Sequence, residues 1–188
     1  MKLISNLTKI VPLLLLVLTT TTSCNNDDDN NEVVPPQPQN IVELALATPE
    51  LSSLVAALTA ADGDLVNVLQ GDGPFTVLAP TNAAFATFLA DNGFAALSDV
   101  PTDVLSQILL NHVISGNVTS SDLVGLGSGY TTTSATGAGS NPMSLYFNTS
   151  NGVRFNGVSS VSTADINASN GTIHIVDAVI GIPTVVTF

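Results

Sequence analysis

The chain has 188 residues, 3 Lys and Arg against 15 Asp and Glu, a formal net charge of −12, and 45% hydrophobic residues. This length fits one domain with accessory segments, and the mean hydropathy of +0.43 supports a packed core. The acidic balance argues against nucleic acid as a partner, because phosphate contacts need Lys and Arg. The single cysteine excludes an internal disulfide framework and any multi-cysteine metal site.

The N-terminus is predicted to be a lipoprotein signal peptide (residues 1–23). A start with two lysines precedes the apolar run 10–18, which is shorter than the about 20 residues that a membrane span needs. Small residues then lead to Cys24, a layout that resembles a bacterial lipoprotein signal, in which the cysteine is acylated and becomes the mature N-terminus. Thr21 stands where leucine is commonest in such signals. An ordinary signal with an incidental cysteine is the alternative interpretation.

Residues 24–39 are predicted to be an acidic, proline-rich tether that cannot bury a core. The first partner is then the lipid bilayer, through acylated Cys24, at the cell outer membrane. The acidic run 25–32 resembles the export signals of some surface-exposed lipoproteins, which favours a surface-exposed domain. A plain solvated linker explains the run equally well, and a periplasmic-facing orientation stays open.

Apolar periodicity predicts helices in the next part of the chain. A short helix at 41–47 precedes a second helix that starts at Pro49, with Thr48 as its N-cap. Further helices are expected at 65–69, after Thr81 as N-cap, and after Pro101, with one buried strand at 75–79.

After about residue 115 the pattern becomes β. Asn151-Gly152 between two apolar runs predicts a hairpin. The Ser- and Gly-rich stretch 125–140 is interpreted as a surface loop. The clearest strands are 143–147, 153–155 and 172–176. Helices first and strands later indicate an α+β domain.

Three separated segments together resemble the fasciclin-like domain: 73–85, 109–116 and 170–180. The resemblance covers residues 40–188 and implies a fasciclin-like fold, a β-sandwich wedge with an N-terminal helical layer. It also implies adhesion and contact with extracellular matrix. Asn111 stands where a tyrosine usually precedes His112, so the receptor recognition of animal members is not carried over. The family-motif positions are Thr76, Pro80, Thr81, Asn82, Phe85, His112, Asn170, Gly171, His174 and Asp177.

These positions also have structural interpretations. His112 ends an apolar helix stripe, where a cation or a hydrogen-bonded imidazole fits. Strand alternation places His174 on the face opposite Ile173 and Ile175. We interpret both histidines as structural hydrogen-bonding residues rather than ligands or bases, and Asp177 as a strand-end acceptor.

The sequence therefore predicts a lipid-anchored, non-enzymatic adhesion module without catalytic residues, metal or cofactor. Its further partner is an unknown protein or polysaccharide, and a monomer is the default state. Alternatives are a polysaccharide- or matrix-polymer-binding protein and a periplasmic envelope scaffold. An enzyme would need a cleft that joins His112 or His174 to an acid.

Overall fold

The computed structural model describes residues 37–182. The predicted signal peptide, Cys24 and most of the tether lie outside the described residues, as do residues 183–188. Within the described part, no single helix is long and apolar enough to cross a membrane. Ile41–Ala47 and Pro49–Ala60 pass that test only as a pair, bent by 106°, and their buried side chains belong to the hydrophobic core.

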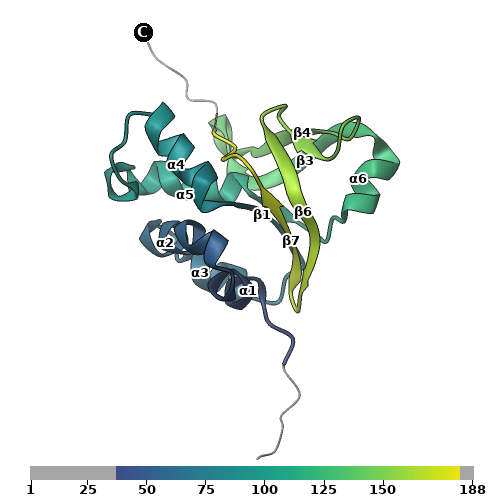
Figure 1. Ribbon diagram of the computed structural model, residues 1–188, viewed down its shortest axis with the longest axis horizontal. Helices are drawn as coiled ribbons and strands as arrows, with labels where there is room; N and C mark the ends of the chain where they lie inside the picture. The colour runs from purple at the N-terminus through teal and green to yellow at the C-terminus, as the bar shows by residue number, and fades with distance from the viewer. Residues whose placement is uncertain (1–36, 183–188) are drawn as a thin grey trace, which may run out of the picture. The chain divides into compact units, whose positions relative to one another are not determined.

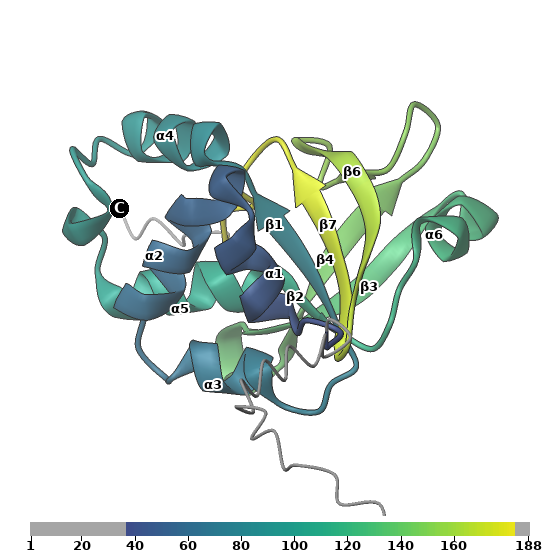
Figure 2. The same ribbon diagram turned by 60° about the horizontal axis from the view of Figure 1, so that its bottom comes forward.

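Helices form a layer on one side of the described domain. In both views, α1 to α5 lie on one side of β1 and β7, whereas α6 lies on the far side, against β3 (Figures 1 and 2). The α-helices are α1 (Ile41–Ala47), α2 (Ser52–Ala60), α3 (Leu65–Gln70), α4 (Asn82–Asp91), α5 (Thr102–Asn111) and α6 (Ser120–Leu126). Short 3₁₀ turns are η1 (Pro49–Leu51), η2 (Leu97–Asp99) and η3 (Ala138–Ser140).

The strands close into one ring. They are β1 (Phe75–Pro80), β2 (Val113–Ser115), β3 (Ser128–Thr136), β4 (Pro142–Asn148), β5 (Arg154–Phe155), β6 (Ser159–Ala168) and β7 (Gly171–Val176). Each pairs antiparallel with the next, and β7 pairs parallel with β1, with Phe75 opposite Gly171. The α+β class is confirmed. The expected sandwich wedge is not confirmed, because each of the seven strands has a paired neighbour on both sides and the strands form a closed barrel.

Strand alternation divides the core into two clusters. Val77 and Ile173 point to the helices and join the larger cluster, whereas Leu78 and Val176 point into the ring and join the smaller one with Phe155. The centre of the domain is therefore the β1–β7 pair, which is covered on both faces. His174 lies on the face opposite Ile173, as the alternation predicts.

Some local predictions are confirmed and others are wrong. The predicted helix at 41–47 is α1, and Thr81 is the N-cap of α4. The stretch 125–140 is not one surface loop, because β3 runs through it, and the region predicted to be purely β also contains α6. Gly129 suits this strand because a Cβ there would come within 3.1 Å of the Phe147 ring.

Two turns also differ from the prediction. Thr48 precedes η1 without capping it, since its hydroxyl donates to the Leu44 carbonyl at 2.7 Å. The β4–β5 hairpin forms, but Asn148 pairs with Arg154, so the loop is longer than the two residues of a tight turn. Only Gly152 of the predicted dipeptide has a positive φ, 81°.

Candidate functional site

His112 follows α5 and is 2% exposed. Its Nδ1 lies 2.7 Å from the Ile108 carbonyl and therefore donates, while its Nε2 accepts from the Ile180 N–H at 2.9 Å. Burial lowers the pKa of His112 to about 4, although the bond to Ile108 acts in the opposite direction. At neutral pH the side chain is therefore a neutral imidazole with both nitrogens in use, rather than a cation at the helix end.

His174 of β7 is 1% exposed and has the opposite tautomer. Its Nδ1 accepts from the Asp165 backbone N–H at 3.1 Å, so Nε2 carries the proton and donates to the Val118 carbonyl at 2.9 Å. The hydrogen bond from this neighbouring acid to the imidazole thus comes from its main chain and not from its carboxylate. The arrangement lacks the acid–histidine bond that orients a general base.

The Asp165 carboxylate instead holds the start of α6. It accepts from the Ser120 backbone N–H at 2.8 Å and from the Ser120 hydroxyl, and these bonds lower the pKa of the Asp165 carboxyl. The residue sits at a register shift in β6 with φ of 58°. Sequence reasoning missed it because a bulge of this kind leaves no periodic signal.

Asn170 joins three elements and is 8% exposed. Its Oδ1 accepts from the Ile41 N–H at 3.0 Å, and its Nδ2 lies 2.8 Å from the carbonyls of both Leu69 and Gly71. Gly171 follows where β7 approaches β1 so closely that a Cβ would lie 1.9 Å from the Phe75 carbonyl oxygen. These two motif positions therefore fix the junction between helical layer and barrel.

Thr76 and Asn82 make similar connections. The buried Thr76 hydroxyl donates to the Gly116 carbonyl at 2.7 Å and accepts from the Val118 N–H at 2.8 Å. Asn82 accepts from the Ser53 N–H at 2.8 Å through Oδ1, which ties α4 to α2. These motif residues therefore connect elements of the fold and leave little polar capacity for a ligand.

The remaining motif residues lie close to the ends of β1 and β7. Pro80 ends β1, the Thr81 hydroxyl accepts from the Ala84 N–H at 3.2 Å, and Phe85 is 3% exposed in the larger core cluster. Asp177 is exposed just after β7, and its Oδ1 accepts from the Ser160 N–H at 2.6 Å.

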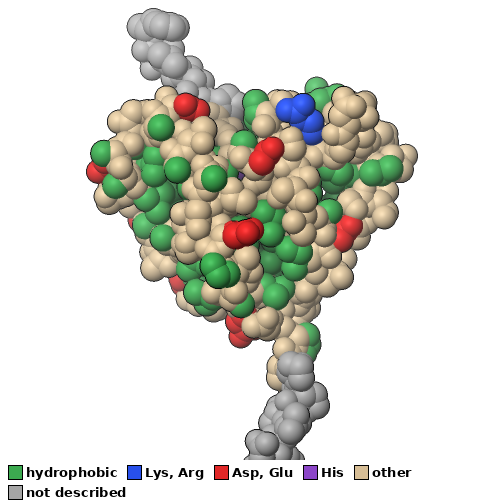
Figure 3. All heavy atoms as spheres, in the orientation of Figure 1, with side chains coloured by type: hydrophobic (Ala, Val, Ile, Leu, Met, Phe, Trp, Pro, Cys, Tyr) green, Lys and Arg blue, Asp and Glu red, His purple; other side chains and the backbone are tan. Residues whose placement is uncertain are grey.

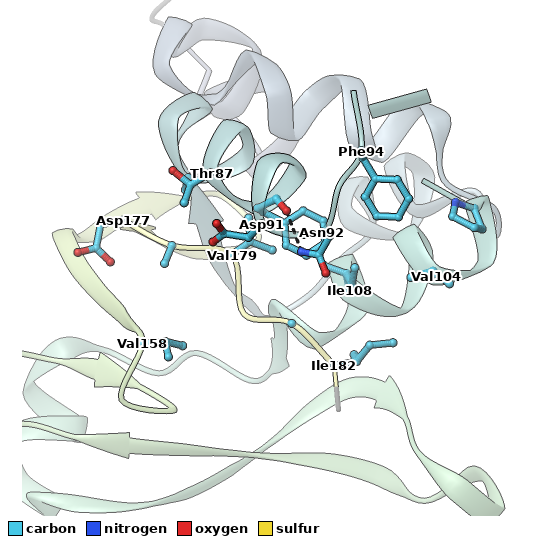
Figure 4. Close-up of a pocket in the computed structure, with 15 residues that line it drawn as sticks. Thr87, Asp91, Asn92, Phe94, Val104, Ile108, Val158, Asp177, Val179 and Ile182 are labelled. Atoms are coloured by element: carbon cyan, nitrogen blue, oxygen red, sulfur yellow. Dashed lines mark hydrogen bonds between the residues drawn. The ribbon is translucent and has the colours of Figure 1, made fainter. Parts of the chain in front are cut away.

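A cavity of about 610 Å³ lies between α4, α5 and the segment after β7. Its walls are mainly apolar, and Asp177 and Phe94 lie at opposite ends with Asp91 between them (Figure 4). None of its described lining residues is His, Lys or Arg. It therefore lacks the histidine–acid pair that the enzyme hypothesis requires. Among residues 37–182, no group of three or more His, Cys, Asp or Glu could hold a metal ion.

The outer surface of β3, β4 and β5 carries a tyrosine pair, of which Tyr130 is exposed and Tyr146 is half-buried. Tyr130 is directly opposite Tyr146, with ring centroids 5.3 Å apart and planes tilted by 57°, and Tyr130 is 75% exposed. We call this surface the tyrosine face, and define it by Ser128, Tyr130, Thr132, Ser144, Tyr146, Asn148 and Arg154. Sequence reasoning missed it because the first three lie in the stretch interpreted as a loop.

Charge is spread thinly over the domain. On the side shown in Figure 3, acidic side chains occur singly among polar and hydrophobic ones, and Lys and Arg form a single blue group. Arg154 is the only Lys or Arg among residues 37–182. Its Nη2 donates to the Gly157 carbonyl at 3.0 Å, which holds the guanidinium beside the β5–β6 turn.

The sequence of this chain is similar to those of known proteins. The Fasciclin domain family matches residues 49–183. The Synechocystis protein sll1483 is 40% identical over 140 residues, which cover 74% of this chain and 72% of that protein. The cell surface glycolipoprotein MPB83 of Mycobacterium bovis is 40% identical over 90 residues, which cover 45% of this chain and 39% of that protein.

Among solved structures, a FAS1 domain pair from the insect cell adhesion molecule fasciclin I aligns with a TM-score of 0.50 and 22% identity. The alignment covers 71% of this chain and 46% of that chain, and at this identity it shows the fold alone. A helical layer packed on a closed seven-stranded barrel is therefore the FAS1 type of α+β domain. The chain belongs to the fasciclin domain family.

Proposed function

We propose that this protein is a non-enzymatic adhesion module, anchored in the cell envelope through acylated Cys24, whose folded domain contacts cell-surface or extracellular-matrix components. The observation that carries the proposal is the tyrosine face. Tyr130 is 75% exposed on regular strands, and exposed aromatic side chains of this kind are enriched where proteins make contacts. The family adds independent support, since the insect protein fasciclin I, whose FAS1 domains share this fold, is a cell adhesion molecule.

The interior of the domain supports contact rather than catalysis. Both histidines use both ring nitrogens in hydrogen bonds to the backbone, so neither ring is hydrogen-bonded to a carboxylate. A general base needs a free nitrogen within reach of a substrate proton. The residues most suited to acid–base chemistry therefore serve the fold.

The anchor and the location are proposed from the sequence and from one relative. The stretch before Cys24 resembles a lipoprotein signal, and MPB83 is a cell surface glycolipoprotein. We propose the outer membrane as the site of anchoring, with the domain exposed at the surface. Two or more acyl chains on Cys24 would hold the protein stably at a bilayer.

Attachment assays test the adhesion proposal. A strain that lacks the gene is compared with strains that carry the wild-type chain or Cys24→Ser, under conditions where the protein is made. We expect the deletion to reduce attachment and biofilm formation, and Cys24→Ser to release the protein from the membrane fraction without restoring attachment. Normal attachment by the deletion strain would refute the proposal.

Protease accessibility separates the surface from the periplasm. The tagged chain is digested on intact cells and, as a control, after lysis. Digestion on intact cells is the expected result. Protection until lysis would instead favour the second candidate, a periplasmic envelope scaffold.

A further inference from the structure

We propose that the tyrosine face is a binding site for a neutral polysaccharide. The inference rests on the proposed function, because the tyrosine face carries the adhesion proposal and the inference names the partner of that face. Nothing in the family-motif positions contributes to this site, since those residues are occupied inside the fold or at its junctions.

Strand register brings the residues of the face together. Phe147 pairs with Gly129 on one side and Phe155 on the other, and both phenylalanines point into the barrel. Their neighbours along the strands must then point outward. Five consecutive residues of β4, from Ser144 to Asn148, give the face a length of about 13 Å at 3.3 Å per residue.

The two tyrosine rings of the face contact each other in the absence of a ligand. The rings contact each other in a tilted arrangement, which is favourable for aromatic pairs. Asn148 is oriented as well, because its Oδ1 accepts from the Ser150 N–H at 2.9 Å. A ligand that stacks on Tyr130 therefore meets a ring that already contacts Tyr146, beside an oriented Asn148.

The chemistry of the face matches a sugar. Aromatic faces carry negative charge density, and sugar rings present C–H groups made slightly positive by their oxygens. The side chains around the rings are hydroxyls, one amide and one guanidinium, which donate to and accept from sugar hydroxyls. The side chains that define the face are polar or aromatic, so a purely apolar partner would leave their hydrogen-bonding groups unpaired.

Charge decides between classes of polymer. The chain as a whole carries −12, so it repels a polyanion, and one arginine is a weak counterweight. The overall charge attracts a polycation, but at the face a polycation meets Arg154, and none of the residues that define the face is a carboxylate. An uncharged, hydroxyl-rich polymer is subject to neither repulsion.

Affinity electrophoresis of the purified full chain tests the site. Native gels contain laminarin, mannan, dextran or xylan as neutral probes, and alginate as the charged comparison. The variants are Tyr130→Ala and Tyr130→Phe, and the control is Leu46→Ala, an exposed apolar residue (64%) in α1 of the helical layer. Circular dichroism verifies that each variant is folded.

We expect at least one neutral polymer to retard the wild-type chain, equally at 0.1 and 0.5 M salt. Tyr130→Ala should lower the association constant about tenfold, comparable to the loss of one aromatic stacking contact with a nucleobase. Tyr130→Phe and Leu46→Ala should bind as the wild type does, because the ring is kept or lies elsewhere.

Three results would overturn the inference: no retardation by any polymer, equal retardation of the wild type and Tyr130→Ala, or retardation by alginate alone that salt abolishes. The attachment assay distinguishes this failure from failure of the adhesion proposal. If the wild type binds no glycan, or binds it no better than Tyr130→Ala, while the protein still supports attachment, the adhesion proposal stands with a different partner. If the deletion strain attaches normally, adhesion fails whatever the gels show.

Discussion

The buried histidine His112 makes the stability of the domain depend on pH. Its pKa is lowered from 6.5 to about 4 in the folded state. Between pH 6.5 and pH 4, His112 is therefore protonated in the unfolded chain but neutral in the folded chain. The contribution of His112 to the free energy of unfolding is therefore complete above pH 6.5, decreases as the pH falls from 6.5 to 4, and is lost below pH 4. The shift of about 2.5 units corresponds to about 3 kcal/mol in total.

The geometry of the site explains why protonation of His112 is unfavourable in the folded state. Protonation of Nε2 would turn it from an acceptor into a donor that faces the Ile180 N–H, and the charge would lie in a site that is 2% exposed. Between pH 7.5 and 5.0 this single group should remove about 2 kcal/mol from the free energy of unfolding. The lowered carboxyl pKa of Asp165 acts in a different window, because its contribution is lost only as the pH falls below the usual aspartate range.

Urea unfolding followed by circular dichroism measures the effect, which suits a chain without tryptophan. The comparison is His112→Asn, whose amide can donate to the Ile108 carbonyl and does not titrate. This variant should be less stable at pH 7.5 but lose about 2 kcal/mol less than the wild type on going to pH 5.0. Parallel pH profiles for the two chains would refute the assignment of the effect to His112.

Three further substitutions test the interior and the surface. Asn170→Ala leaves three backbone partners without their side-chain bonds and should lower the free energy of unfolding by about 3 kcal/mol, as measured by urea denaturation. Gly171→Ala forces a Cβ toward the Phe75 carbonyl and should lower stability by about 2 kcal/mol, with faster amide hydrogen exchange in β1 and β7; unchanged exchange would contradict the close approach. Tyr130→Ala should change the free energy of unfolding by less than about 0.5 kcal/mol, as measured by urea denaturation; a larger loss would mean that the ring supports the fold.

Local patterns in the sequence predicted local structure well. The helix at 41–47 and the cap at Thr81 follow from apolar spacing and from one side-chain oxygen, and the structure contains both. The alternation of β7 also predicted that His174 and Ile173 point to opposite faces. Each of these features depends on residues that are close in the chain.

Long-range pairing and irregular backbone were not accessible in the same way. The parallel β1–β7 pairing joins Phe75 to Gly171, and no periodicity reports which distant strands become neighbours, so the closed barrel was missed. The bulge that turns Asp165 toward Ser120 is a backbone feature without a pattern. The tyrosine face was missed because the Ser- and Gly-rich composition of β3 resembles a loop, although β-branched and aromatic residues there favour a strand.

The placement of the motif residues explains why a family resemblance predicts the fold better than the partner. Hydrogen bonds to backbone groups use the polar side-chain atoms of Asn170, Thr76 and His112, so a chain that keeps these residues keeps the architecture. Tyr130 and Arg154 lie outside these motifs, on outward positions that packing does not constrain. Because core contacts and surface contacts are made by different residues, the surface can change its ligand without a cost to the barrel. The outward side chains of β3, β4 and β5 are therefore the basis of our proposal that the partner is an uncharged, hydroxyl-rich polymer.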